Sequence, residues 1–142
     1  MKTRLLFLLC LAPILGIAQI QIGNDIDGDA AEDYCGSSVS VSADGSVVAI
    51  LSAGTTPVSP ANATDPGHVQ VYQNNSGVWT QIGDDINAEA VGALRYGEVS
   101  LSADGKVVAI GVPKNTDNVQ DGGHVMVFRN NAGTWTQVGT DI

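Results

Sequence analysis

Basic residues and cysteines are scarce in this chain of 142 residues. Six Lys and Arg stand against 15 Asp and Glu, which gives a formal net charge of −9, and there are only two cysteines. Nucleic acids and anionic membrane surfaces attract basic residues, so the acidic balance argues against both as partners. Beyond the N-terminal segment the chain also lacks a sustained helical period and a long apolar run, which argues against helical bundles and membrane-spanning helices.

Residues 1–18 have the pattern of a secretory signal peptide. Lys2 and Arg4 precede an apolar stretch that ends in small residues at Ala18, where we expect cleavage. A retained membrane anchor is the less favoured alternative. Cleavage removes Lys2 and Arg4, so the charge of residues 19–142 becomes −11. It also leaves Cys35 as the single cysteine, either an apolar filler or a partner for another chain. The sequence therefore predicts a secreted or cell-surface protein.

The rest of the chain is a repeat. Four short sequences recur in order, the early ones after 60 residues and the late ones after 56: Gln21–Ile26 at Gln81–Ile86, Ser42–Gly45 at Ser102–Gly105, Gly67–Val69 at Gly123–Val125, and Trp79-Thr80 at Trp135-Thr136. Such a period is typical of solenoids, propellers and arrays. We predict one repeat over residues 19–80, a second over 81–136 and the start of a third over 137–142.

Each repeat predicts four short antiparallel strands. The expected strands are 38–42, 47–51, 68–72 and 78–82 in the first repeat, and 98–102, 107–111, 124–128 and 134–138 in the second. Asp44-Gly45 and Asp104-Gly105 have the composition of tight hairpin turns. The fold class is therefore all-β, an array of four-stranded blades. Because a closed propeller needs about four to eight blades, we expect an incomplete propeller that further repeats or self-association would cover.

These residues resemble the FG-GAP repeat family, which forms the β-propeller of integrin α-subunits, and more closely its bacterial secreted variant. The resemblance rests on the residues in the second repeat at Tyr96-Gly97, 99–105, 111–113, 123–128 and 133–137, and on their counterparts in the first. It departs from the pattern at Cys35, which stands before Gly36, and at 51–53, which replaces a Gly-Ala-Pro step. The resemblance implies a propeller fold and says little about the ligand.

An acidic segment is the candidate metal site. Integrin-type repeats often carry a calcium loop, and a hard cation needs several oxygen ligands around one turn. The turns at Asp44 and Asp104 supply one carboxylate each, so we expect hairpins there. The segment 25–33 is the better calcium candidate, with Asp25, Asp27, Asp29 and Asp33 as ligands beside Glu32. A solvated acidic loop is the alternative.

The remaining polar residues indicate framework rather than chemistry. His68 and His124 occupy one repeated position after Gly, with no second ligand two to four residues away, so the spacing argues against zinc and for a structural role at a strand start. Trp79 and Trp135 favour packing over carbohydrate stacking because they also recur. We find no nucleophile elbow, phosphate cradle or other catalytic arrangement.

The sequence favours a non-enzymatic exported module that binds an extracellular protein or a glycan. The segments 53–66 and 113–122 differ between the repeats, as ligand-binding loops would. A structural spacer within a larger secreted protein is the main alternative. A propeller enzyme whose site lies outside this sequence is the least favoured one. No cofactor other than calcium is expected.

Overall fold

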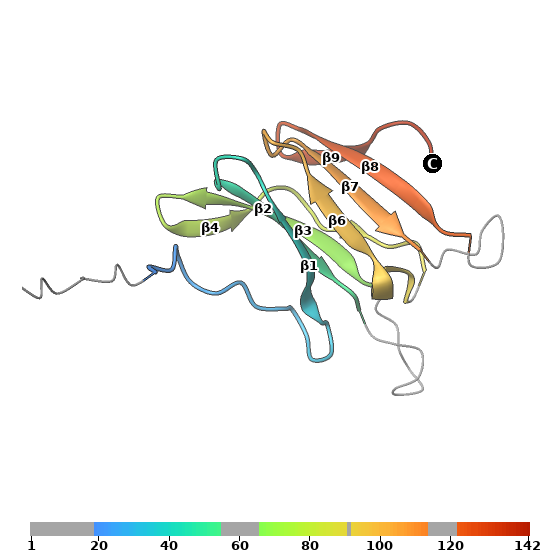
Figure 1. The fold of residues 1–142 in the computed structure, drawn as a ribbon, viewed down its shortest axis with the longest axis horizontal. Coiled ribbons are helices and arrows are strands. Elements are labelled where there is room, and N and C mark those ends of the chain that lie inside the picture. Colours follow the sequence, from blue (N-terminus) through green and yellow to red (C-terminus); the bar gives the residue numbers. More distant parts are fainter. Residues whose placement is uncertain (1–18, 55–65, 91, 114–121) are drawn as a thin grey trace, which may run out of the picture.

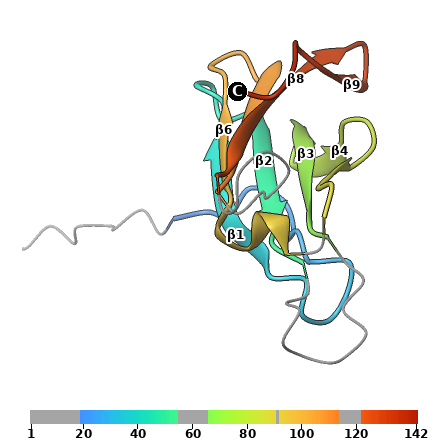
Figure 2. The ribbon, with the colours of Figure 1, turned by 90° about the vertical axis from the view of Figure 1, so that its right-hand side faces the viewer.

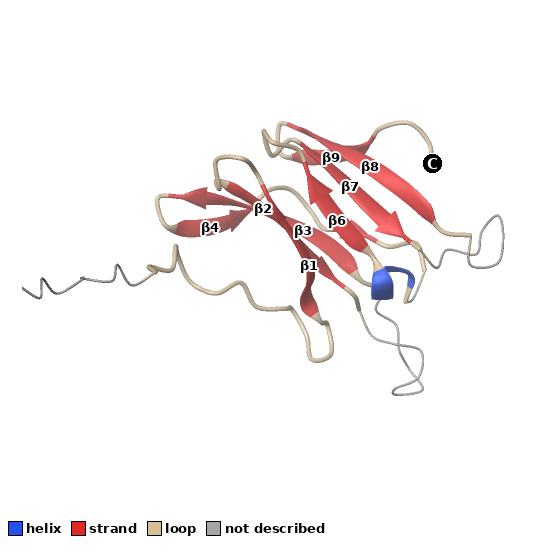
Figure 3. Cartoon of the chain, in the orientation of Figure 1, coloured by secondary structure: helices blue, strands red, loops and turns tan. Residues whose placement is uncertain are grey.

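The computed structural model describes residues 19–54, 66–90, 92–113 and 122–142. They form two antiparallel sheets, and within these ranges the only helix is the short 3-10 helix η1 (Ala93–Tyr96), as Figure 3 shows. The all-β prediction is confirmed. The predicted signal peptide and most of the two variable loops lie outside the described residues. No helix among the described residues is long and apolar enough to cross a membrane.

The first sheet has the order β1-β2-β3-β4, with a short fifth strand on β3 (Figure 1). Its strands are β1 (Cys35–Val41), β2 (Val47–Ser52), β3 (His68–Asn75), β4 (Val78–Gln81) and β5 (Ile86–Asn87). Consecutive strands pair with each other, so the chain meanders from β1 to β4. β5 continues beyond β4 along the same edge of β3 and pairs with the start of β3.

The second sheet repeats the first. Its order is β6-β7-β8-β9, formed by β6 (Glu98–Leu101), β7 (Val107–Val112), β8 (His124–Asn131) and β9 (Thr134–Gln137). The register is the same as well, because Val48 opposes Tyr72 in the first sheet and Val108 opposes Phe128 in the second. The predicted strands are therefore found in both repeats, as four-stranded antiparallel sheets.

The two sheets meet through their first strands. The backbone N–H groups of Val99 and Leu101 in β6 donate to the side-chain hydroxyls of Ser38 and Ser40 in β1, at 3.1 and 2.9 Å. Figure 2 shows β1 and β6 together on one side of the molecule and β4 and β9 on the other. The backbone N–H groups on this edge of β6 therefore bond to side chains of the first sheet and not to the backbone of another strand.

One apolar core fills the space between the sheets. It is formed by Val47, Ala49, Leu51, Val69 and Val71 of the first sheet, by Val108, Ile110, Val112 and Met126 of the second, and by Leu94 and Val99 before and within β6. β2 is buried almost throughout its length, as its continuous apolar sequence predicts, whereas the residues of β7 alternate between buried and half-buried. The second sheet is therefore covered on one face more fully than on the other.

Each tryptophan forms a hydrogen bond between its sheet and the segment that precedes that sheet in the chain. The indole N–H of Trp79 donates to the carbonyl of Ile22 at 2.9 Å, and that of Trp135 donates to the carbonyl of Ile82 at 2.7 Å. Both indoles therefore serve packing between segments, as their recurrence predicts. Gly83, next to Ile82, has a φ of +74° and lies against Trp135 and the backbone of Gly133.

Replacing Gly83 by Ala is expected to destabilise the fold more than the same change at Gly139. Both glycines have left-handed backbone, with φ of +74° and +77°, so each Ala costs about 1–2 kcal/mol of unfolding free energy. A Cβ at Gly83 would also collide with the carbonyl oxygen of Gly133, while a Cβ at Gly139 meets no atom of the described residues within 4 Å. The collision adds about 1–3 kcal/mol. Urea unfolding of both variants measures the difference, and equal losses would contradict this packing.

Candidate functional site

Each sheet carries one group of an imidazole and two carboxylates. The first group is Asp29, His68 and Asp85, and the second is Glu89, His124 and Asp141. In each group the candidate ligand atoms all lie within 4.8 Å of one another. The three positions correspond between the repeats, because the carboxylates before the sheet, the histidines and the carboxylates after the sheet recur in the same order. The chain has therefore built the same polar group twice.

The segment that follows the fourth strand of each sheet brings the later carboxylate to the histidine. It continues along the third strand: His68 is the first residue of β3, and Ile86 pairs with the next residue, Val69. The corresponding segment after β9 joins Ile142 to Val125 by two backbone hydrogen bonds of 3.1 Å. Asp85 directly precedes Ile86, so this pairing places its carboxylate beside the imidazole.

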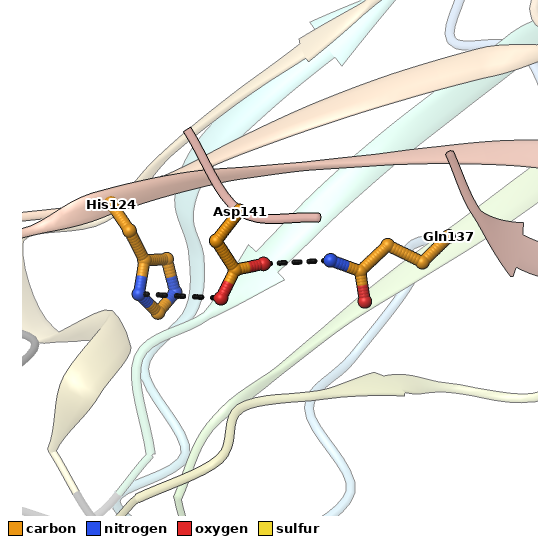
Figure 4. A network of polar contacts seen from close by, with 3 residues as sticks. All are labelled: His124, Gln137 and Asp141. Carbon is orange, nitrogen blue, oxygen red and sulfur yellow. Dashed lines mark hydrogen bonds and ion pairs between the residues drawn. The ribbon is translucent and has the colours of Figure 1, made fainter. Parts of the chain in front are cut away.

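A glutamine in the fourth strand orients each of these later carboxylates. The amide of Gln81 donates to Asp85 at 2.6 Å, and the amide of Gln137 donates to Asp141 at 2.6 Å. Figure 4 shows the second case, with Asp141 lying between His124 and Gln137. The glutamine thus fixes one oxygen of the carboxylate and leaves the other for the histidine.

The earlier carboxylate is held differently in the two groups. In the first repeat the amide of Gln70 donates to Asp29 at 3.1 Å, and the hydroxyl of Tyr72 donates to the Gln70 carbonyl oxygen at 3.1 Å. Burial raises the pKa of Tyr72, and the charges of Asp29 and Asp85 raise it further. The second repeat has Met126 and Phe128 at the positions of Gln70 and Tyr72. Neither side chain can donate to Glu89, so the first group is the better organised.

Both imidazoles are buried with a ring nitrogen unused. His68 is only 7 % exposed, and its Nε2 atom has no hydrogen-bond partner among the described residues. The Nε2 atom of His124 is buried without a partner in the same way, and its Nδ1 atom lies 3.8 Å from a carboxylate oxygen of Asp141. A neutral imidazole with two carboxylates can bind a divalent cation, whereas a protonated one would form an ion pair.

The structure brings only one of the four predicted calcium ligands into such a group. Asp29 joins His68, whereas Asp25 accepts a hydrogen bond from Gln21 at 2.7 Å. Asp33 is buried, and one of its oxygens accepts the backbone N–H of Asp29 at 3.1 Å, while the other has no partner in the described part of the chain. Neither polar group found among the described residues contains Asp25, Asp27 or Asp33. A calcium site on those carboxylates stays a prediction.

Sequence spacing missed the partners of the histidines. Both imidazoles do stand at strand starts, as predicted, but their carboxylate neighbours come from segments before the first strand and after the fourth. A search for ligands within a few residues of His68 cannot find them. The signal that was available is the repeat itself, since an acidic residue recurs at 29 and 89 and an aspartate at 85 and 141 together with the histidines.

The Asp-Gly sequences are hairpin turns. The carboxylate of Asp44 accepts the backbone N–H of Ser46 and the hydroxyls of Ser42 and Ser46, and these bonds lower its pKa from 3.8 to about 2. The Ser102 hydroxyl and the Lys106 backbone N–H lower the pKa of Asp104 in the same way. Each carboxylate is therefore used within its own turn, as the hairpin prediction requires.

Comparison of the chain with protein-family models gave no match, and comparison with curated proteins gave none at the threshold applied.

Proposed function

We propose that this chain is a non-enzymatic, exported repeat module of the β-propeller type, which stacks on further repeats or on a second copy and binds an extracellular protein or a glycan. The observation that carries the proposal is the interface between the two sheets. Some of its buried apolar residues, such as Val99 and Val69, have exposed counterparts on the two outer faces, Val39 and Val125. Each outer face thus resembles one half of the interface and is uncovered, so a further module can stack on it in the same way.

The outer face of the first sheet exposes the residues that the second sheet buries at the interface. Leu94, just before β6, is 1 % exposed, whereas Tyr34, just before β1, is 56 % exposed. Val99 is 8 % exposed, and its counterpart Val39 is 61 % exposed. Val41 in β1 is exposed as well. These side chains form an apolar surface that a preceding module would cover.

The outer face of the second sheet has a surface on which a following module could pack. Val125 is exposed, whereas its counterpart Val69 is fully buried against the second sheet. Val125 and Gly111 line a hollow of about 510 Å³ on this face. Gly111 is the counterpart of Leu51, which is part of the core between the two sheets. Ser100, the counterpart of Ser40, is exposed and can accept a hydrogen bond as Ser40 does. The outer face of the second sheet thus offers a neighbouring module apolar surface and one of the two serine acceptors, with Glu98 at the position of Ser38.

Head-to-tail contacts of this kind close into a ring or extend as a filament. A ring of four-stranded sheets is a propeller, the fold that the FG-GAP resemblance implies. In this arrangement the repeated polar residues serve each module, while loops that differ between modules supply the ligand surface. A spacer role would use the same stacking without a ligand.

Val39→Lys is expected to reduce self-association of the purified chain. The lysine places a charge on the apolar face of β1, where stacking would desolvate it. Val78→Lys is the matched control, because Val78 is about equally exposed, at 63 % against 61 %, but lies in β4, away from that face. Sedimentation velocity over a concentration series measures the association. A wild-type chain that stays monomeric throughout, or a Val39→Lys chain that associates like the control, would contradict stacking on a second copy.

The binding role is tested by screening the wild-type chain against glycan arrays and extracellular matrix proteins. We expect saturable binding to one class, and loss of that binding when the segment 55–65 is exchanged for the segment 114–121. Self-association without any ligand would favour the spacer role over the binding role.

A further inference from the structure

We propose that each sheet, together with the segments before and after it, binds one divalent transition-metal ion, the first between Asp29, His68 and Asp85 and the second between Glu89, His124 and Asp141. The inference does not depend on the proposed binding role. It differs from an integrin-type calcium loop, because the ligands come from three separate segments and include an imidazole.

The distances suit a metal site. Zinc–nitrogen and zinc–oxygen bonds are about 2.0–2.2 Å long, so ligand atoms around one ion lie about 3–4 Å apart. The candidate atoms already lie within 4.8 Å of one another, without an ion. Asp29 and Glu89 are exposed and stand outside the strands, so small side-chain movements can close the remaining gap.

The buried histidines supply the independent evidence. His68 is more than nine-tenths buried, and its Nε2 atom lacks a partner among the described residues. The Nε2 atom of His124 is buried and unpartnered as well. A buried polar atom without a partner costs about 1–3 kcal/mol, so it is normally avoided. Each imidazole thus has a buried, unpartnered Nε2 atom and belongs to a group with two carboxylates, which points to a missing ligand. In the second group, the ring nitrogen recorded beside Asp141 is Nδ1, at 3.8 Å.

The donor set selects the class of cation. Imidazole nitrogen favours zinc and its first-row neighbours, whereas calcium and magnesium prefer sites made of oxygen alone. Two carboxylates balance the charge of a divalent ion. Three protein ligands also leave a position open for water or for a group from a partner.

The ion would connect the two segments that flank each sheet. Asp29 precedes β1 and Asp85 follows β4, while His68 stands at the start of β3. Coordination therefore ties the entering and leaving segments to the middle of the sheet. Metal binding to the folded chain alone raises its melting temperature.

The first experiment titrates Zn²⁺ into the purified, tag-free full chain in competition with a chromogenic chelator. We expect two ions per chain in the wild type. His68→Gln and His124→Gln should each bind one ion, and the double variant none. Asp25→Asn is the matched control, because Asp25 is bonded to its glutamine like Asp85 but has no histidine in its group, and it should still bind two.

A second measurement needs no variant. Nitrogen-15 spectra of the two imidazoles should shift on addition of Zn²⁺ and stay unchanged on addition of Ca²⁺. Imidazole signals that ignore Zn²⁺ would overturn the proposal. Two bound ions in the folded double histidine variant would overturn it as well, because the ligands would then lie elsewhere.

The two sites should differ in affinity. Gln70 holds Asp29 in the first site, and Met126 at the corresponding position leaves Glu89 without that support. Loss of such outer contacts typically weakens metal binding about 10–100-fold. In the same titration Gln70→Met should weaken one site by that amount and keep two ions per chain. An unchanged affinity at both sites would contradict the assignment of the first site to Asp29.

Discussion

The edge of β6 is the constraint on which the rest of the structure depends. A strand edge carries backbone N–H groups that must find acceptors when they are covered. Here Ser38 and Ser40 supply the acceptors, and their spacing of two residues puts both hydroxyls on one face of β1. The two hydrogen bonds fix how far the second sheet is shifted along the first. That register places Val99 and Leu94 in the shared core with Leu51.

The same repetition explains the polar groups. The segment after the fourth strand pairs with the third strand of each sheet, through Ile86 in the first and Ile142 in the second. The pairing places an aspartate beside a histidine in both sheets without any local sequence motif. The proposed metal ions would therefore reinforce a junction that backbone pairing has already formed.

The strands and turns were predictable because their signals are local. Alternation, apolar runs and Asp-Gly pairs depend on neighbouring residues, and each recurs in both repeats. The sequence misled at β1, where Val39 and Val41 have the pattern of a buried face but are exposed. Alternation shows that one face is apolar and cannot show whether this chain covers it. The partners of His68 were missed for a similar reason, since they depend on how distant segments pack.

Amide hydrogen exchange, measured on the monomeric chain, tests the packing of the sheets most directly. The amides of Val99 and Leu101 should exchange slowly, because they donate to the two serine hydroxyls at the interface. Their counterparts Val39 and Val41 should exchange quickly, since they lie on the uncovered first strand. Fast exchange at all four amides would contradict the interface, because β6 would then behave as a free edge.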